Sequence, residues 1–257
     1  MITTTVTCLP RLTVHWQPWQ LAPIAEATIS VFRTKIIDNE SIINNYHSLL
    51  QPREQQRAAR FRQTADRNRY ILGRGLFRVM AGQITGKAPQ SVSIVAVPTG
   101  KPILRENPNW HFSVSHTGDW VLLAVGQTPL GVDIEFVNPR FIIDDLIPSV
   151  LSAAEQRVLI ESTDSHLFFY ECWTRKEALV KATGEGITND FINIPALEGE
   201  HMVKSSLIGN NFPWQIQPFF VSDTYPAALA NVYINSMESP QFYEIDPARL
   251  SEWVAVH

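Results

Sequence analysis

The chain has 257 residues, of which 45% are hydrophobic and 18% are charged, and its formal charge is −4. This length supports one large globular domain or two small ones, and the composition excludes a disordered chain. The net acidic balance disfavours general nucleic-acid binding, and two cysteines are too few for a disulfide framework or a zinc site built mainly from cysteine. There is no signal-peptide pattern and no apolar run of roughly 18 residues, so we expect a soluble, cytoplasmic protein that does not use a membrane.

In chain order, hydrophobic periodicity predicts strands and helices in a repeated arrangement. The expected strands lie at residues 12–16, 92–97, 111–115, 121–126, 131–137, 214–221 and 227–234. The expected helices lie at residues 39–48, 52–66, 67–86, 153–162 and 165–183. Ser152 and Glu155 have the spacing of a capping box, and Gly184 follows the last helix as a stop signal. The order strand, helices, strands occurs twice, which predicts an α+β fold with two halves, residues 1–130 and 131–257.

An arginine-rich segment interrupts this acidic chain. Between Arg53 and Arg78 there are eight arginines and two acids, so the segment carries +6 and the remainder carries −10. Guanidinium groups bind phosphate oxygens with two N–H groups at once, which makes the segment a candidate site for a polyanionic ligand. A solvated helix face explains the same run, because arginine is a good helix former. The run by itself favours that simpler explanation.

The sequence GVDIE at residues 131–135 places two acids on one predicted strand. Residues two apart share a face of a strand, so Asp133 and Glu135 are expected to point together. Two carboxylates repel each other unless a cation lies between them, and Mg²⁺ is often held by carboxylates together with phosphate oxygens. A half-exposed strand with a polar face accounts for the same spacing, and the motif alone favours it.

The sequence WTRKEALVKATGEGI at residues 173–187 adds a third carboxylate on a predicted helix. Trp173, Glu177 and Lys181 follow one another at i, i+4 and i+8 and therefore share a stripe. Glu177 is a candidate metal ligand and Lys181 a candidate phosphate ligand, while Lys176 is offset by about 100° toward another part of a ligand. Glutamate followed by lysine at i+4 is also a common stabilising pair, and it suffices to explain this segment alone.

Two shorter motifs, TGKP at residues 99–102 and SVSH at residues 113–116, mark chain turns. Gly100 permits close approach of the backbone to a ligand, and Lys101 follows it as a point charge. Ser115 and His116 end a predicted strand. An ordinary turn explains each motif taken alone.

In this order and spacing, the four motifs resemble the 4′-phosphopantetheinyl transferases of the Sfp type. The resemblance covers about residues 45–190 and includes the arginine-rich helices, with RAARF at 57–61. The form Trp173 to Lys176-Glu177-Ala178 resembles the subgroup that serves secondary-metabolite and related carriers, often with broad carrier tolerance. The resemblance implies two similar α+β halves related by a pseudo-twofold axis, with coenzyme A bound between them.

The resemblance also implies a division of roles among the site residues. The first half would hold the 3′-phosphate and adenine of coenzyme A, and the second half would carry the metal and catalysis. Mg²⁺, with Mn²⁺ as an alternative, would be held by Asp133, Glu135 and Glu177. The expected catalytic residues are Glu177, Lys181 and His116, the last two contacting the phosphates.

Further contacts to coenzyme A follow from the same resemblance. They are Arg57 and Arg69 at the 3′-phosphate, Gly100, Lys101 and Pro102 around the adenine, Ser115 at the nucleotide, and Lys176 at a phosphate. Glu54 stands where some family members have a basic phosphate ligand, so the 3′-phosphate is expected to depend on Arg57, Arg69 and His116.

The implied reaction transfers phosphopantetheine from coenzyme A to a serine of an apo acyl carrier or peptidyl carrier protein. It releases adenosine 3′,5′-bisphosphate, which is the activity of a holo-acyl-carrier-protein synthase. Glu177 is the expected acceptor of the serine proton, directly or through water. The carrier is expected to be acidic, its pathway (fatty acid, polyketide or nonribosomal peptide) is open, and the transferase is expected to be a monomer.

Two other functions fit the same residues. A Mg²⁺-dependent hydrolase of nucleotide pyrophosphates would use the three carboxylates with water as the nucleophile. A non-enzymatic carrier-binding protein would need none of them, and the intact cluster of like charges therefore disfavours it. Coenzyme A incubated with Mg²⁺ and no carrier separates the hydrolase from the transferase.

Overall fold

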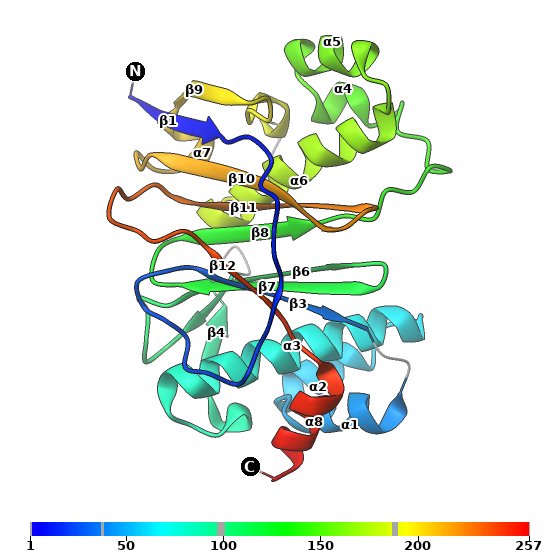
Figure 1. Ribbon diagram of the computed structural model, residues 1–257, viewed down its shortest axis with the longest axis vertical. Coiled ribbons are helices and arrows are strands. Elements are labelled where there is room, and N and C mark those ends of the chain that lie inside the picture. The colour runs from blue at the N-terminus through cyan, green and yellow to red at the C-terminus, as the bar shows by residue number, and fades with distance from the viewer. Residues whose placement is uncertain (1, 37–38, 97–100, 187–189, 257) are drawn as a thin grey trace. The chain divides into compact units, whose positions relative to one another are not determined.

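The computed structural model describes residues 2–36, 39–96, 101–186 and 190–256 (Figure 1). It divides into two compact units with separate hydrophobic cores. Unit 1 comprises Met1–Val14, Pro98–Lys101 and Thr128–Ser236, and unit 2 comprises His15–Val97, Pro102–Gln127 and Met237–His257. The α+β class predicted from the sequence is confirmed, since each unit has a five-stranded sheet and one long helix.

Unit 1 is built on a five-stranded sheet of order β8-β11-β10-β1-β9. Its strands are β8 (Leu130–Ile134), β11 (Tyr225–Val232), β10 (Trp214–Ser222), β1 (Thr3–Cys8) and β9 (Gly199–Lys204). Its helices are α4 (Ile147–Val150), α5 (Ala153–Glu161), α6 (Ser165–Thr183), the 3₁₀-helix η2 (Phe191–Asn193) and α7 (Ser205–Ile208). The long helix α6 packs across β8 and β11, so the two acidic motifs of the sequence lie on elements in direct contact.

Unit 2 has a second five-stranded sheet, of order β2-β12-β3-β7-β6, and a two-stranded sheet of β4 and β5. Its strands are β2 (Gln17–Pro18), β12 (Gln241–Glu244), β3 (Ser30–Lys35), β7 (Trp120–Gly126), β6 (His111–Thr117), β4 (Ile94–Ala96) and β5 (Pro102–Leu104). Its helices are α1 (Glu40–Ser48), α2 (Pro52–Ala58), α3 (Thr64–Thr85), the 3₁₀-helix η1 (Pro89–Ser91) and α8 (Pro247–Val256). Helix α3 packs on β6 and β7, which brings the arginine-rich helices next to the SVSH strand.

The helix ends follow local sequence chemistry. The capping box of α5 is confirmed: Ser152 N donates to Glu155 Oε2 at 2.8 Å, and Glu155 N donates to Ser152 Oγ at 3.4 Å. Helix α6 begins after Asp164, whose side chain accepts from Leu167 N at 2.9 Å, and it ends at Gly184 with a left-handed φ of 78°. In the described part of the chain, no helix combines the length and hydropathy needed to cross a membrane.

The compact units differ from the expected halves, residues 1–130 and 131–257, at both ends of the chain. Strand β1 pairs in parallel with β10 and antiparallel with β9, which places the N-terminal residues in unit 1. Strand β12 pairs with β2 and β3, which places the C-terminal residues in unit 2. Such pairings join residues 191 to 226 positions apart, so local periodicity carries no trace of them.

Several strand and helix predictions were wrong in detail. Residues 12–16 form no strand: Leu12 makes one isolated bridge to Phe219. The predicted helix over 52–66 is two helices, α2 and the start of α3. The predicted strand over 131–137 ends at Ile134, and strands β1, β3, β9 and β12 with helix α8 were not predicted.

Gly131 explains why β8 and α6 pack so closely. A Cβ atom at this position would overlap the carbonyl oxygen of Ala178 and the amide nitrogen of Ala182. We therefore expect Gly131→Ala to lower the free energy of unfolding by about 1–3 kcal/mol, because the overlap forces strand and helix apart. Urea unfolding monitored by circular dichroism measures the change, and an unchanged midpoint would contradict the close packing.

Candidate functional site

The polar cluster of unit 1 consists of Asp133, Glu177 and Lys181. Asp133, from β8, is 3% exposed, and Glu177, from the middle of α6, is 9% exposed. Lys181 lies one turn further along α6, and its Nζ donates to Asp133 Oδ1 at 2.6 Å. The structure thus brings together three residues that the sequence selected from two motifs 44 residues apart.

The carboxyl of Glu177 has unusual protonation chemistry. Burial raises the pKa of Glu177 to about 7, the charge of Asp133 adds to the rise, and Lys181 opposes it. Its Oε1 atom is buried and has no hydrogen-bond partner among the described residues. Such a group is suited to accept a proton near neutral pH or to coordinate a cation.

The three predicted metal ligands are not all gathered in one place. In the described ranges, no group of three histidine, cysteine, aspartate or glutamate side chains is arranged to hold a metal ion. Glu135 follows the end of β8, is half-buried, and its backbone N–H donates to Pro226 O at 3.1 Å. Burial raises the pKa of Tyr170, and the charge of Glu135 adds to the rise. Glu135 therefore lies near the turn of α6 that carries Tyr170, which precedes the turn that carries Glu177.

The chemistry of Asp133 and Glu177 nevertheless fits a divalent cation. Asp133 and Glu177 are close enough for the charge of one to raise the pKa of the other, and both are buried. Lys181 meets part of that negative charge, while Glu177 Oε1 is left without a donor in the described structure. Oxygen ligands of this kind are those that Mg²⁺ prefers.

The contacts of Lys176 differ from those expected of a phosphate ligand. Its side chain is 0% exposed, and Nζ donates to Glu155 Oε2 at 2.8 Å and to Ile192 O at 3.1 Å. Burial lowers the pKa of Lys176, and Glu155 opposes that shift. The offset of about 100° from the Glu177 stripe points this lysine into the core of unit 1 rather than toward a ligand.

The sequence predicted only a capping role for Glu155, which also has long-range partners in this core. Besides capping α5 and pairing with Lys176, it accepts from Ala196 N through Oε1 at 2.9 Å. One carboxylate therefore joins α5, α6 and the segment after η2. A buried acid three residues after a capping serine carries no sequence signal for such long-range partners.

The expected adenine-lining motif is only partly described. Gly100 lies outside the described residues, and Pro102 is the half-buried first residue of β5. Lys101 Nζ donates to three backbone carbonyls, those of Leu130 at 2.9 Å, Lys181 at 2.8 Å and Ala182 at 2.8 Å. Burial lowers the pKa of Lys101 to about 8. Its ammonium therefore serves the end of α6 instead of facing a nucleotide.

In unit 2, two of the residues expected at the 3′-phosphate, Arg69 and His116, lie near the turn after β6. Arg69 is half-buried and donates to Gly118 O at 2.6 Å and to Asp66 Oδ1 at 2.6 Å. His116, two residues before Gly118, is exposed at the end of β6, and Ser115 beside it is 7% exposed. Arg57, on α2, is exposed and lies 5.2 Å from the ring centre of Tyr70 on α3.

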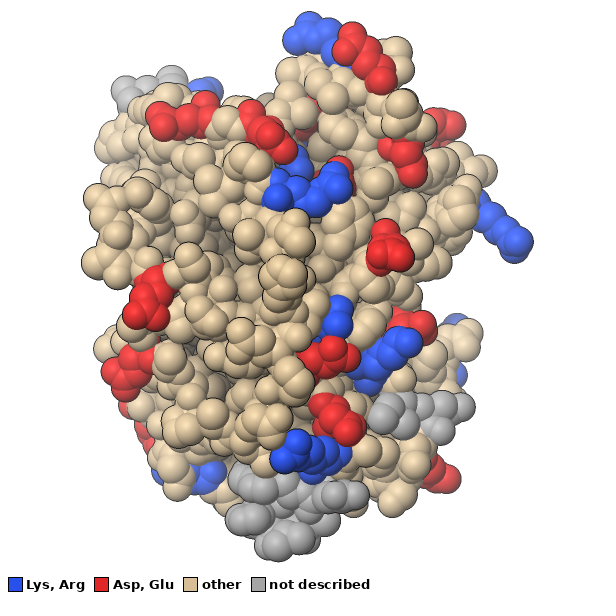
Figure 2. All heavy atoms as spheres, viewed as in Figure 1, with Lys and Arg blue, Asp and Glu red and all other residues tan. Residues whose placement is uncertain are grey.

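Two of the eight arginines in the arginine-rich segment pair with a buried acid, Glu54. Glu54 accepts from Arg78 Nε at 2.6 Å and from Arg74 Nε, and it caps α2 through Gln51 N at 2.8 Å. Burial raises the pKa of Glu54, but the two arginines outweigh it and leave the pKa below its ordinary value. On the face shown in Figure 2, basic and acidic side chains are likewise interspersed. The net +6 already counts Glu54, and its pairing commits Arg74 and Arg78 to contacts inside the fold.

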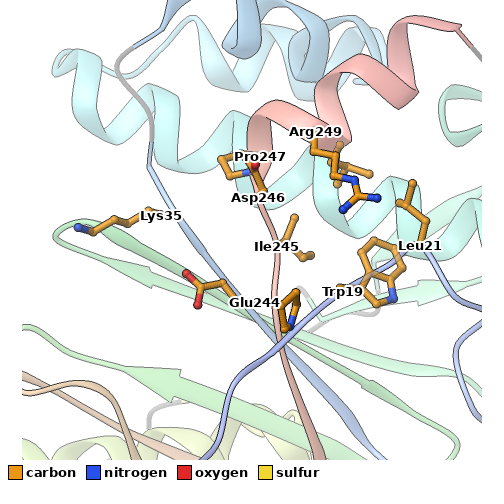
Figure 3. Close-up of a pocket in the computed structure, with 10 residues that line it drawn as sticks. Trp19, Leu21, Lys35, Glu244, Ile245, Asp246, Pro247 and Arg249 are labelled. Carbon is orange, nitrogen blue, oxygen red and sulfur yellow. The ribbon is translucent and has the colours of Figure 1, made fainter.

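A cavity of about 440 Å³ in unit 2 contains none of the predicted site residues. Figure 3 shows Trp19 and Leu21 on one side of it, Glu244 and Lys35 on the other, and Arg249 from α8 above. Glu244 is already paired with Arg33 at 2.8 Å. Size alone therefore does not locate the chemistry of this protein.

Comparisons with known proteins identify the family of this chain. The family described as 4′-phosphopantetheinyl transferase, N-terminal, matches residues 39–128, and the 4′-phosphopantetheinyl transferase superfamily matches residues 129–230. The 4′-phosphopantetheinyl transferase psf-1 of Bacillus pumilus is 30% identical over 198 residues, covering 71% of this chain and 82% of that protein. The chain belongs to the 4′-phosphopantetheinyl transferase superfamily.

Two further members of the superfamily place the chain among Sfp-like proteins. The 4′-phosphopantetheinyl transferase Sfp of Bacillus subtilis (strain 168) is 27% identical over 72% of this chain and 83% of its own length. The 4′-phosphopantetheinyl transferase HetI of Nostoc sp. is 31% identical over 62% of this chain and 70% of its own length. The Sfp-type resemblance seen in the motifs is confirmed.

Proposed function

We propose that this chain transfers the 4′-phosphopantetheine group of coenzyme A to a serine hydroxyl of apo acyl carrier or peptidyl carrier proteins. The observation that carries the proposal is the cluster of the buried Asp133 and Glu177 with the half-buried Lys181, formed by the two most specific motifs in a member of this superfamily. The reaction forms a bond from the serine oxygen to the β-phosphorus and breaks the bond to adenosine 3′,5′-bisphosphate.

The residues divide the chemistry between proton transfer and charge. Glu177 accepts the serine proton, since a pKa of about 7 allows it to be ionised before the reaction and to hold the proton afterwards. The ammonium of Lys181 stabilises charge that develops on the leaving phosphate, and positioning supplies much of the remaining rate.

A divalent cation, Mg²⁺ or Mn²⁺, would be held by Asp133 and Glu177, and Glu135 would have to move toward them to act as the third ligand that the resemblance implies. When bound, it would neutralise the buried carboxylates and polarise the pyrophosphate oxygens. Lys181 pairs with Asp133, so a cation held by Asp133 would compete with this ion pair and leave the ammonium for phosphate.

The nucleotide end of coenzyme A is assigned to unit 2. Arg57 and His116 are exposed and Arg69 is half-buried, so all three are candidates for the 3′-phosphate, with Ser115 nearby. Glu54 takes no part as a ligand because Arg74 and Arg78 occupy both of its oxygens. An acidic carrier, a monomeric enzyme and a cytoplasmic location are further parts of the proposal.

Mass spectrometry of apo-carriers incubated with the protein, coenzyme A and Mg²⁺ tests the function. We expect each accepted carrier to gain the mass of one phosphopantetheine, and Asp133→Ala to reduce the rate by at least about 100-fold. The exposed Asp223→Ala is the matched control and should retain full rate. Release of adenosine bisphosphate without a carrier would favour a hydrolase, and unmodified carriers in every reaction would favour a binding protein.

A further inference from the structure

The ammonium group of Lys101 donates three hydrogen bonds inside the protein. An ammonium has three N–H donors, and those of Lys101 reach three backbone carbonyls at 2.8–2.9 Å. No donor is left over for an adenine or a phosphate. The lysine of the TGKP motif therefore acts on the protein's own backbone.

The three carbonyls belong to the two elements that carry the catalytic cluster. Lys181 and Ala182 lie in the last turn of α6, where carbonyls have no partner within the helix. Leu130 is the first residue of β8 and immediately precedes Gly131, where strand and helix approach most closely. Lys101 thus binds the end of the helix and the start of the strand with one group.

The same helical turn presents the side chain of Lys181 to Asp133. The carbonyl of Lys181 accepts from Lys101, while its Nζ donates to Asp133 Oδ1 at 2.6 Å. Main chain and side chain of Lys181 are therefore held from opposite ends. A half-buried cation next to the negative end of a helix also stabilises that last turn electrostatically.

We infer that Lys101 is a positioning residue for Lys181 in the transfer reaction. It holds the last turn of α6 so that the Lys181 ammonium meets Asp133 and, in the reaction, the leaving phosphate. It touches no ligand itself. This inference rests on the proposed function of the cluster and adds a role for a residue outside it.

Lys101→Met, which keeps the length of the side chain and removes the three donors, tests the inference. Because small displacements of a catalytic group are costly, we expect kcat to fall about 10–100-fold while KM for coenzyme A changes less than about threefold. Lys87→Met, at an exposed lysine paired with Glu106, should leave both constants unchanged. A large rise in KM with kcat unchanged would show direct ligand contact and overturn the inference, as would an unaltered kcat.

A double-mutant cycle separates positioning from an independent role. In a Lys181→Ala background, Lys101→Met should cause less than about threefold further loss, because the group it positions is already absent. A full second loss of 10–100-fold would overturn the inference. If Lys101→Met does not fold, Lys101→Arg keeps the charge and donors and should show the same split of kcat and KM in milder form.

Hydrogen exchange gives a readout that does not need activity. Lys101→Met should lose amide protection in the last turn of α6, including Gly184 N, which donates to Val180 O at 2.9 Å. Lys87→Met should keep it, and unchanged protection in Lys101→Met would overturn the inference. If Lys101→Met loses this protection but the wild-type protein modifies no carrier, the result counts against the proposed function alone.

Discussion

Glu177→Gln is expected to lower the rate of phosphopantetheine transfer by about 10²–10⁴-fold, the range typical for removal of a general base. Glutamine keeps the size of the side chain but cannot accept the serine proton. Single-turnover transfer to an apo-carrier at saturating coenzyme A and Mg²⁺ measures the chemical step. Glu161→Gln, at an exposed position of α5, is the control. A Glu177→Gln enzyme with full rate would exclude the base role.

The same substitution should raise the stability of the protein in the absence of added metal. Burial, with the charge of Asp133, raises the pKa of Glu177 from 4.5 to about 7 in the folded state. A raised carboxyl pKa means that the folded state holds the proton more tightly than the unfolded state. For Glu177 alone, stability is therefore greatest below about pH 4.5 and falls as the pH rises, and the loss is complete above about pH 7.

Glutamine removes this pH-dependent loss. At pH 8, Glu177→Gln should unfold with a free energy higher by roughly 3 kcal/mol, the order of magnitude that corresponds to the pKa shift. At pH 4 the two proteins should differ little. Thermal unfolding with a chelator present measures both values. Equal stability of the two proteins at pH 8 would contradict the buried, ionised Glu177.

Lys176→Met is expected to be the most destabilising of these substitutions. The ion pair with Glu155 has exposed fractions of 0% and 2%, so removal of the lysine leaves a buried carboxylate with an unbalanced charge. Such a break costs about 3–5 kcal/mol, which corresponds to a fall in Tm of roughly 10 °C in a protein of this size. Differential scanning calorimetry measures the change, with Lys87→Met as the exposed-lysine control.

Kinetics of the same variant distinguish a core role from a ligand role. Below its unfolding temperature, Lys176→Met should retain a KM for coenzyme A close to the wild-type value. A double substitution with Glu155→Gln should cost less than the sum of the two single changes, because the residual charge is then removed as well. A stable Lys176→Met protein with a strongly raised KM would restore the phosphate contact that the sequence suggested.

The local chemistry of the sequence determined the elements that carry the site. The capping box at Ser152 and the stop at Gly184 predicted α5 and α6 closely because helix ends depend on neighbouring residues. The resemblance of the four motifs implied that Asp133 and Glu177 share one site, and the structure places Asp133, Glu177 and Lys181 together.

Only the tertiary structure decided which charged groups are available for chemistry. Lys176 and Lys101 look like ligand residues in a one-dimensional motif, yet each donates to partners inside the fold, and Glu54 is likewise paired with arginines. The side chains and backbone carbonyls that they contact lie 16 to 81 residues away along the chain. A charged side chain takes the partners that burial brings to it, and burial depends on the packing of distant elements, which no local pattern of residues records.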